Sequence, residues 1–289
     1  MKALDADSAP GWKSSFAGNL YLEYQPIVSL VSQEIAAFEV LTRCHDPFLG
    51  IVPPLQVVPW IKRIGLSGLH TRWVLRGACR EAALWSGSGA IVDVSVNVSP
   101  QDLSRPRFPT AVIEALRQSD LDPKRLQLEV TEDSMVDMNQ QTRSCMNELR
   151  SLGVRFAMDD FGAGYAGLST LQDMPVDTVK LDRSLVQPLA ESSKSQKIVD
   201  SVIALSHDLG IEVVGEGVET RQQLAFLTDA GCDLIQGHFF SPALGAERVA
   251  NAMTPSLAFS TLDRVRLAGN ARRLAFGPAR VSRVRRAVA

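Results

Sequence analysis

The chain has 289 residues, of which 45% are hydrophobic, and it carries a net charge of −2. This length and composition are typical of one large globular domain or two smaller ones. The sequence contains neither an apolar run of about 18 residues nor the apolar core of a signal peptide, so it predicts a soluble, cytoplasmic protein and excludes a membrane-spanning or secreted one.

Charge and cysteines exclude some further classes. Eight arginines and one acid follow Leu262, which leaves 22 basic and 31 acidic residues before that point. A basic tail of this kind can contact membrane or nucleic acid, but Gly269 and Gly277-Pro278 interrupt any helix, so we expect a solvated extension with neither partner. The cysteines are too widely spaced for a zinc site or a disulfide framework: Cys44, Cys79, Cys145 and Cys232.

Strand and helix patterns alternate along the chain. Eight runs have strand character: 21–30, 35–43, 90–99, 126–132, 154–161, 177–182, 211–218 and 232–240. Six stretches have helical spacing: 68–86, 108–118, 136–152, 164–173, 193–209 and 220–230. Thr220 is a predicted N-cap, and Gly153, Gly210 and Gly231 are predicted to end helices.

Repeated strand-helix units with apolar strands predict parallel pairing. The first two strands are joined by a connection too short for a crossover, so the first strand should run antiparallel to the second. We therefore predict an α/β fold, a TIM-like (β/α)8 barrel with an antiparallel first strand. The alternative fold is a doubly wound open sheet, which fits the pattern less well. Residues 19–255 would form the barrel, residues 1–18 an N-terminal extension and residues 256–289 a basic C-terminal extension.

Polar side chains stand at nearly every strand end. In a barrel these ends converge on one mouth, which makes the side chains a candidate site. They are Glu39, Asn97, Glu129, Asp159, Asp160, Lys180, Asp182, Glu216 and Gln236.

Several carboxylates at one mouth repel one another unless cations neutralise them. Carboxylate and amide oxygens select hard cations such as Mg²⁺ or Mn²⁺. The adjacent Asp159 and Asp160 suit two ions, about 3.5 to 4 Å apart, which is typical of phosphodiester or phosphomonoester hydrolysis. Lys180 could hold the attacking water, or deprotonate it if burial and nearby metals lower its pKa.

Eight motifs then resemble the EAL-domain family of cyclic di-GMP-specific phosphodiesterases, in order and in approximate spacing. They are YQPIVSL, FEVLTR, SVNVS, LEVTED, DDFGAGYAGL, VKLDRS, VVGEGVET and GCDLIQGHFFS, and they cover roughly residues 19 to 250. The resemblance implies a TIM-like barrel that cuts cyclic di-GMP to linear pGpG with Mg²⁺ or Mn²⁺, and a tendency to form homodimers.

The resemblance also implies roles for individual residues. Glu39, Asn97, Glu129 and Asp159 would hold one ion, and Asp159, Asp160 and Glu216 the other. Lys180 would position the water, with Glu216 and Asp160 beside it. Gln25, Arg43, Asp182 and Gln236 would face or support the substrate, and Arg43 would contact a phosphate. Glu132 and Glu219 would anchor the site's loops, Glu132 the one after Asp160 that the family ties to metal binding and dimerisation.

The chain departs from the family pattern beside the predicted metal ligands. Val40 replaces the alanine of the signature triplet, Cys44 replaces a tryptophan, and 57–66 lacks the usual phenylalanine and alanine-glutamate pair. Asp182 and Glu219 could equally make structural ion pairs with Arg183 or Arg221.

Two other functions remain open. One is a catalytically silent module that binds cyclic di-GMP or a protein partner. The other is a metal-dependent enzyme acting on a different phosphate ester. The retained metal ligands favour the phosphodiesterase.

Overall fold

The computed structural model describes residues 19–46, 50–87, 91–132, 139–164, 171 and 174–253. The predicted extensions at 1–18 and 256–289 lie outside these residues, as does most of the predicted helix at 164–173. Within the described part, no helix combines the length and the hydropathy needed to cross a membrane.

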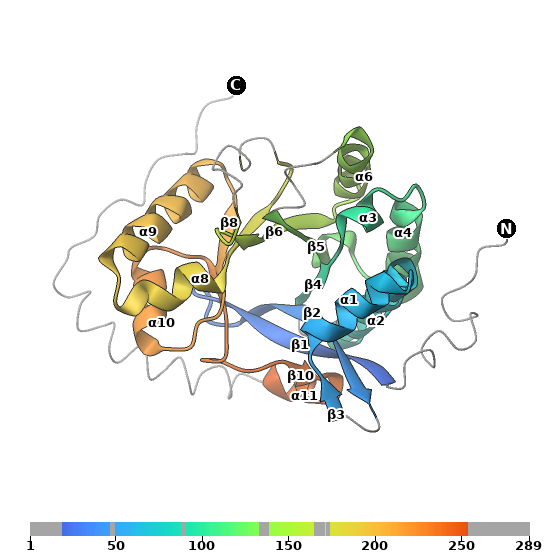
Figure 1. Cartoon of the computed structure of the whole chain (residues 1–289), viewed down its shortest axis with the longest axis horizontal. Helices are drawn as coiled ribbons and strands as arrows, with labels where there is room; N and C mark the ends of the chain where they lie inside the picture. Colours follow the sequence, from blue (N-terminus) through green and yellow to red (C-terminus); the bar gives the residue numbers. More distant parts are fainter. Residues whose placement is uncertain are drawn as a thin grey trace.

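The strands form one mixed sheet that closes into a barrel (Figure 1). Of the ten described strands, β3 and β10 lie outside the ring, so eight strands close it. The predicted TIM-like barrel is confirmed. The strands are β1 Asn19–Ser29, β2 Ile35–Asp46, β3 Gly50–Val52, β4 Asp93–Asn97, β5 Leu126–Thr131, β6 Arg155–Phe161, β7 Thr178–Leu181, β8 Glu212–Gly215, β9 Leu234–Gln236 and β10 Leu244–Gly245.

Strand β1 runs against its neighbours in the ring. It pairs antiparallel with both β2 and β9, whereas β2 pairs parallel with β4 and the ring continues parallel from β4 to β9. The predicted antiparallel first strand is therefore confirmed. The chain turns back between Ser29 and Ile35, and Gln33 takes a φ of 63° there.

Helices surround the ring, with α9 and α10 on one side and α2 and α4 on the other (Figure 1). They are α1 Pro54–Arg63, α2 Ser67–Gly87, α3 Pro100–Leu103, α4 Phe108–Ser119, α6 Gln140–Ser151, α8 Arg183–Val186, α9 Ser193–Asp208, α10 Arg221–Asp229 and α11 Ala246–Ala252. Two 3₁₀ turns cover Pro123–Arg125 and Gln187–Ala190. The predicted helices at 68–86, 108–118, 193–209 and 220–230 correspond to α2, α4, α9 and α10, and α6 covers the described part of 136–152.

The predicted helix ends are present. The Thr220 side chain accepts a hydrogen bond from the backbone N–H of Gln223, which caps α10. Gly153, Gly210 and Gly231 follow α6, α9 and α10 with φ values of +100°, +75° and +82°, the left-handed conformation that favours glycine after a helix.

Six elements were not predicted: β3, β10, α1, α3, α8 and α11. Strands β3 and β10 have three and two residues, and α3 and α8 have four each, too few to show a period. Helix α1 contains Pro59, and a proline inside a sequence segment argues against predicting a continuous helix there.

The apolar core lies between the sheet and the helices. Phe38, Val94, Leu128, Phe156 and Val179 have no exposed surface, and they belong to one cluster with apolar helix residues. Because side chains alternate along a strand, the neighbours of these residues point into the barrel. The barrel interior therefore receives the polar residues that end the strands.

Candidate metal centre and active site

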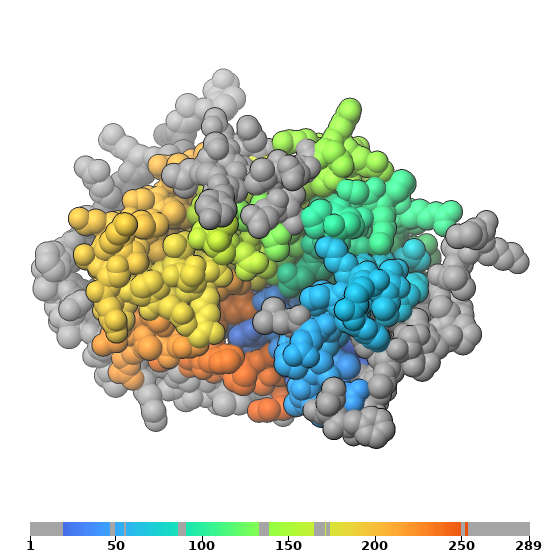
Figure 2. All heavy atoms as spheres, viewed as in Figure 1, coloured from blue at the N-terminus to red at the C-terminus, as the bar shows by residue number. Residues whose placement is uncertain are grey.

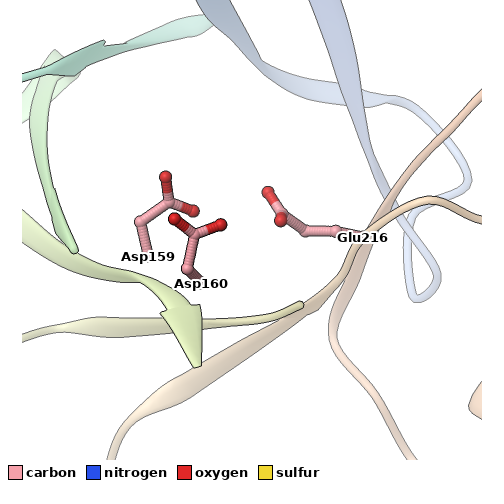
Figure 3. A group of neighbouring side chains, drawn as sticks. All are labelled: Asp159, Asp160 and Glu216. Atoms are coloured by element: carbon pink, nitrogen blue, oxygen red, sulfur yellow. The ribbon is translucent and has the colours of Figure 1, made fainter. Parts of the chain in front are cut away.

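Asp159 and Asp160 lie near the end of β6, before Phe161, and both side chains reach the same face of the barrel. In a regular strand Asp160 would follow Met158 away from the interior. The pairing of β6 with β7 shifts register between Met158 and Phe161, and Asp160 has a φ of 57°, in the left-handed region that aspartate tolerates. This bulge turns both carboxylates to the mouth, where Figure 3 shows them pointing toward the space in front of Glu216.

Asp159, Asp160 and Glu216 form an acidic group that could hold a metal ion. One oxygen from each lies within 4.8 Å of the others. Burial, with the charges of Asp159 and Asp182, raises the pKa of Asp160 to about 6. Burial also raises the pKa of Glu216 to about 8, against the lowering effect of Lys180. Negative charge at this place is costly without a cation.

The Lys180 ammonium lies among four carboxylates. Its side chain is 1% exposed, and Nζ lies 2.7 Å from Glu216, 2.9 Å from Glu129, 3.3 Å from Asp159 and 3.5 Å from Glu39. Burial lowers its pKa, but the carboxylates outweigh burial and hold the pKa well above its usual value. Without bound cations the surrounding carboxylates therefore raise this pKa, whereas the lowering considered from the sequence requires nearby metals as well as burial.

Glu39 is held by amide donors from two strands. It accepts hydrogen bonds from Asn97 Nδ2 at 2.8 Å and from Gln236 Nε2 at 2.6 Å. Burial raises the pKa of this carboxyl, but Lys180 and the two amides together lower it below its usual value. Gln25 lies directly opposite Glu39 in the pairing of β1 with β2.

The donor set fits Mg²⁺ or Mn²⁺. Among the described residues, buried Gln236 Oε1 accepts no hydrogen bond, and buried Asp159 Oδ1 has only the 3.3 Å ion-pair contact with Lys180 Nζ. Asn97 uses its amide nitrogen on Glu39, which leaves its oxygen for another partner. Oxygen atoms from carboxylates and amides are the ligands that hard cations prefer.

The comparisons with known proteins decide the family. The family model described as the EAL domain matches residues 13–243. The chain belongs to the EAL domain family.

Two relatives illustrate this similarity. An uncharacterized signaling protein of Caulobacter vibrioides is 39% identical over 235 residues, which is 81% of this chain and 28% of the relative. The cyclic di-GMP phosphodiesterase NbdA of Pseudomonas aeruginosa is 38% identical over 226 residues, 78% of this chain and 29% of the relative. The chain thus spans less than a third of the length of these curated relatives.

Solved structures agree with the EAL assignment. The PaMucR phosphodiesterase in its c-di-GMP complex has a TM-score of 0.75 and 34% identity, covering 80% of this chain and 94% of that one. The EAL enzyme Bd1971, with cAMP and cyclic di-GMP bound, has a TM-score of 0.77 and 29% identity, covering 81% and 65%.

The surface of this EAL domain is hollowed near the centre of the face drawn in Figure 2, between α8 in yellow and α1 in blue. Both helices follow strand ends, α8 after β7 and α1 after the β2–β3 ribbon. The hollow therefore lies at the mouth end of the barrel.

Arg43 is already paired in this EAL domain. Its Nε donates to Glu23 Oε2 at 2.8 Å, and its Nη1 donates to the carbonyl oxygen of Thr42 at 3.2 Å. The two side chains come from facing strands and are 17% and 25% exposed. These bonds use two of the five N–H groups of the guanidinium and hold it in place.

Three further predicted residues lie around the mouth. Glu132 is buried and accepts a hydrogen bond from the backbone N–H of Gly162 at 2.8 Å, in the turn after Asp160. Asp182 caps the start of α8. Glu219 forms a 2.9 Å ion pair with Arg183, with side chains 39% and 56% exposed. Of the two open interpretations of Glu219, the structure shows the ion pair.

The structure shows the surroundings of the positions at which the chain departs from the family motifs. Val40 points away from the barrel interior into the core, so its extra methyl groups do not reach the metal ligands. Cys44 is buried in a small cluster with Leu20, Val57 and Ile61, the last two from α1. The altered segment from 57 onward therefore packs as a helix against β2.

The sequence analysis missed four residues beside the site: Glu23, Ser95, Gln127 and Thr178. Ser95 donates to Glu129 Oε1 at 2.5 Å, and Gln127 contacts both Ser95 and Thr178. A signal was present in the sequence, because Ser95, Gln127 and Thr178 each stand two positions before a residue that was predicted. Glu23 gives no such signal, since its contact depends on the pairing of β1 with β2.

Proposed function

We propose that this EAL domain hydrolyses cyclic di-GMP to linear pGpG in the presence of Mg²⁺ or Mn²⁺. The observation that carries the proposal is the cluster at the mouth, in which Lys180 and the bulged Asp159-Asp160 pair face Glu216. The names of the NbdA and PaMucR phosphodiesterases support the same reaction and substrate.

Two ions would be held by the mouth residues. Glu39, Asn97, Glu129 and Asp159 would hold one, and Asp159, Asp160 and Glu216 the other. When bound, such ions polarise the phosphoryl group and supply an activated water at neutral pH. The chain's own contribution is to bring these oxygens together. The electrostatic repulsion between the carboxylates would be offset by the cations.

Lys180 orients the water in this proposal. In the fold without cations the surrounding carboxylates raise its pKa, so the ammonium is protonated and donates hydrogen bonds. Contacts of 2.7 Å to Glu216 and 2.9 Å to Glu129 fix the position of Nζ. Water oxygen bonds to phosphorus and one P–O ester bond breaks. In the overall balance one proton of the water is transferred to the leaving ribose oxygen, which becomes a hydroxyl and opens the ring to pGpG.

Arg43 and its neighbours would bind the substrate. The Arg43 guanidinium, held by Glu23, would bind a phosphate through its remaining N–H groups. Gln25 lies opposite Glu39 on β1, and Asp182 lies close enough to Asp160 to raise its pKa. Gln236 is buried against Glu39, so we assign it to supporting that ligand.

The test is chromatographic. Purified chain is mixed with cyclic di-GMP and Mg²⁺ or Mn²⁺, with EDTA as the control, and the formation of pGpG is measured. Product that disappears with EDTA is the expected result. A nucleotide that binds at equilibrium but stays uncut would identify a receptor and contradict the proposal.

Two finer expectations stay predictions. The resemblance implies a homodimer, which analytical ultracentrifugation would check. A cytoplasmic location follows if the substrate is the intracellular messenger, and fractionation of the cells that make this protein would check it.

A further inference from the structure

A buried polar layer lies inside the barrel, one step below the mouth. Ser95, Gln127 and Thr178 each precede a mouth residue by two positions on β4, β5 and β7. Residues two apart on a strand face the same side, so all three point into the barrel. Their exposed fractions are 0%, 7% and 1%.

Hydrogen bonds join this layer to the site. Gln127 Nε2 donates to Thr178 Oγ1 at 2.7 Å. To do so it reaches across β6, where Ala157 faces Thr178 and offers only a methyl group. At its other end, Gln127 Oε1 lies 3.3 Å from Ser95 Oγ.

Ser95 also donates a hydrogen bond to Glu129. Its Oγ lies 2.5 Å from Glu129 Oε1, the length of a hydrogen bond to a charged acceptor. The hydroxyl carries one proton, which it shares in a three-centre hydrogen bond, mainly with Glu129 Oε1 at 2.5 Å and more weakly with Gln127 Oε1 at 3.3 Å. Lys180 holds the other carboxylate oxygen at 2.9 Å, which leaves Glu129 with both oxygens fixed.

The rest of the barrel interior shows that this polar layer is not a general need of the fold. Ile27, Ala37 and Val214 pack together inside the ring, with Leu234 against them. Apolar side chains therefore fill one part of the interior, while the polar layer lies on β4, β5 and β7. Burying polar groups costs free energy unless each is hydrogen-bonded, so the layer needs a reason beyond filling space.

We propose that Ser95 is a positioning residue, braced by Gln127 and Thr178, that aims the Glu129 carboxylate at a metal ion. The inference rests on the proposed function in one respect, the role of Glu129 as a ligand. Groups that hydrogen-bond a ligating carboxylate fix its orientation and its basicity, and their loss typically weakens metal binding about 10- to 100-fold.

Metal affinity tests the proposal without any turnover. Mn²⁺ binding to the whole chain is measured by titration calorimetry for the wild type, Ser95→Ala, Thr178→Val and a control, Ser206→Ala. Ser206 is also fully buried, lies on α9, and its hydroxyl has no hydrogen-bond partner among the described residues. We expect Ser95→Ala to weaken Mn²⁺ binding about 10- to 100-fold, Thr178→Val to weaken it less, and Ser206→Ala to leave it unchanged.

Equal Mn²⁺ affinity in Ser95→Ala and the wild type would overturn the proposal. If Ser95→Ala does not fold, an unchanged affinity in Thr178→Val would overturn it instead. A wild type that binds Mn²⁺ but leaves cyclic di-GMP intact would refute the proposed function alone, and the Ser95 comparison would still decide this inference. A wild type that binds no Mn²⁺ would overturn both.

Discussion

The two sides of the barrel mouth treat their carboxylates differently. On the side of β2, β4 and β9, Glu39 accepts hydrogen bonds from two amides, and its pKa lies below the usual value. On the side of β6 and β8, Asp160 and Glu216 have raised pKa values, about 6 and about 8. The chain's own donors satisfy the first side, and the second side is left in need of cations.

Lys180 connects the two sides. Its ammonium contacts Glu39 on the first side, Asp159 and Glu216 on the second, and Glu129 on β5 between them, where burial raises the pKa of the carboxyl well above its usual value. In the metal-free protein one lysine therefore neutralises these carboxylates, whereas in the metal-loaded protein the cations would neutralise them together with Lys180.

The largest effect is expected from Lys180→Met. This change leaves four buried carboxylates without their cation, so the free energy of unfolding in EDTA should fall by about 3 to 5 kcal/mol. Urea denaturation measures it, with the exposed Lys194→Met as the control. Mn²⁺ should restore part of the loss, and a variant as stable as the wild type would contradict the central role of the ammonium.

Asp160→Asn tests the side that lacks donors. The change keeps the shape and the tolerance for a positive φ but removes a charge, so Mn²⁺ affinity and turnover should each fall by at least about 100-fold. Stability in EDTA should not fall, because the carboxylates repel one another. The exposed Asp229→Asn is the matched control. Wild-type activity in Asp160→Asn would remove Asp160 from the site.

The pH dependence of stability should change sign with metal. Glu216 keeps its proton up to about pH 8 in the metal-free fold, whereas the unfolded chain loses it near its ordinary pKa. The folded state thus binds more protons in this window, so stability in EDTA should fall as pH rises from about 5 to 8. With Mn²⁺, which needs the carboxylates deprotonated, stability should rise over the same range. Thermal unfolding measures both slopes, and parallel slopes would argue against a metal at Glu216.

The smallest effect is expected from Arg43→Lys. A lysine lacks the planar fork, so KM for cyclic di-GMP should rise about tenfold while kcat changes little. Glu23→Gln should act more weakly still, because its amide oxygen can still accept the bond from Nε. Arg80→Lys, at a side chain 71% exposed, is the control. A fall in kcat with constant KM would place Arg43 in the chemical step.

The sequence was sufficient for the barrel and for the residues that meet at its mouth. Parallel strands finish at one edge, so reading strand ends located Glu39, Glu129, Lys180 and Glu216 without any contact information. The position of Asp160 could not be predicted in this way, because its own left-handed backbone conformation decides on which face of the strand its side chain lies. The Arg43–Glu23 pair and the direction of the Lys180 pKa depend on contacts between distant strands, which no local pattern encodes.

The reversed direction of β1 has one more consequence. Asn19 pairs with His45 and Tyr21 with Arg43, so the first residues of β1 lie beside the mouth. If β1 ran parallel to its neighbours, its last residues would lie there instead. Counted along β1 from Asn19, the residue that pairs with Arg43 is two positions away and the residue that pairs with Glu39 is six positions away. The beginning of β1 is thus coupled directly to this side of the mouth, and a force or a label placed there would act on Arg43 and, further along, on Glu39.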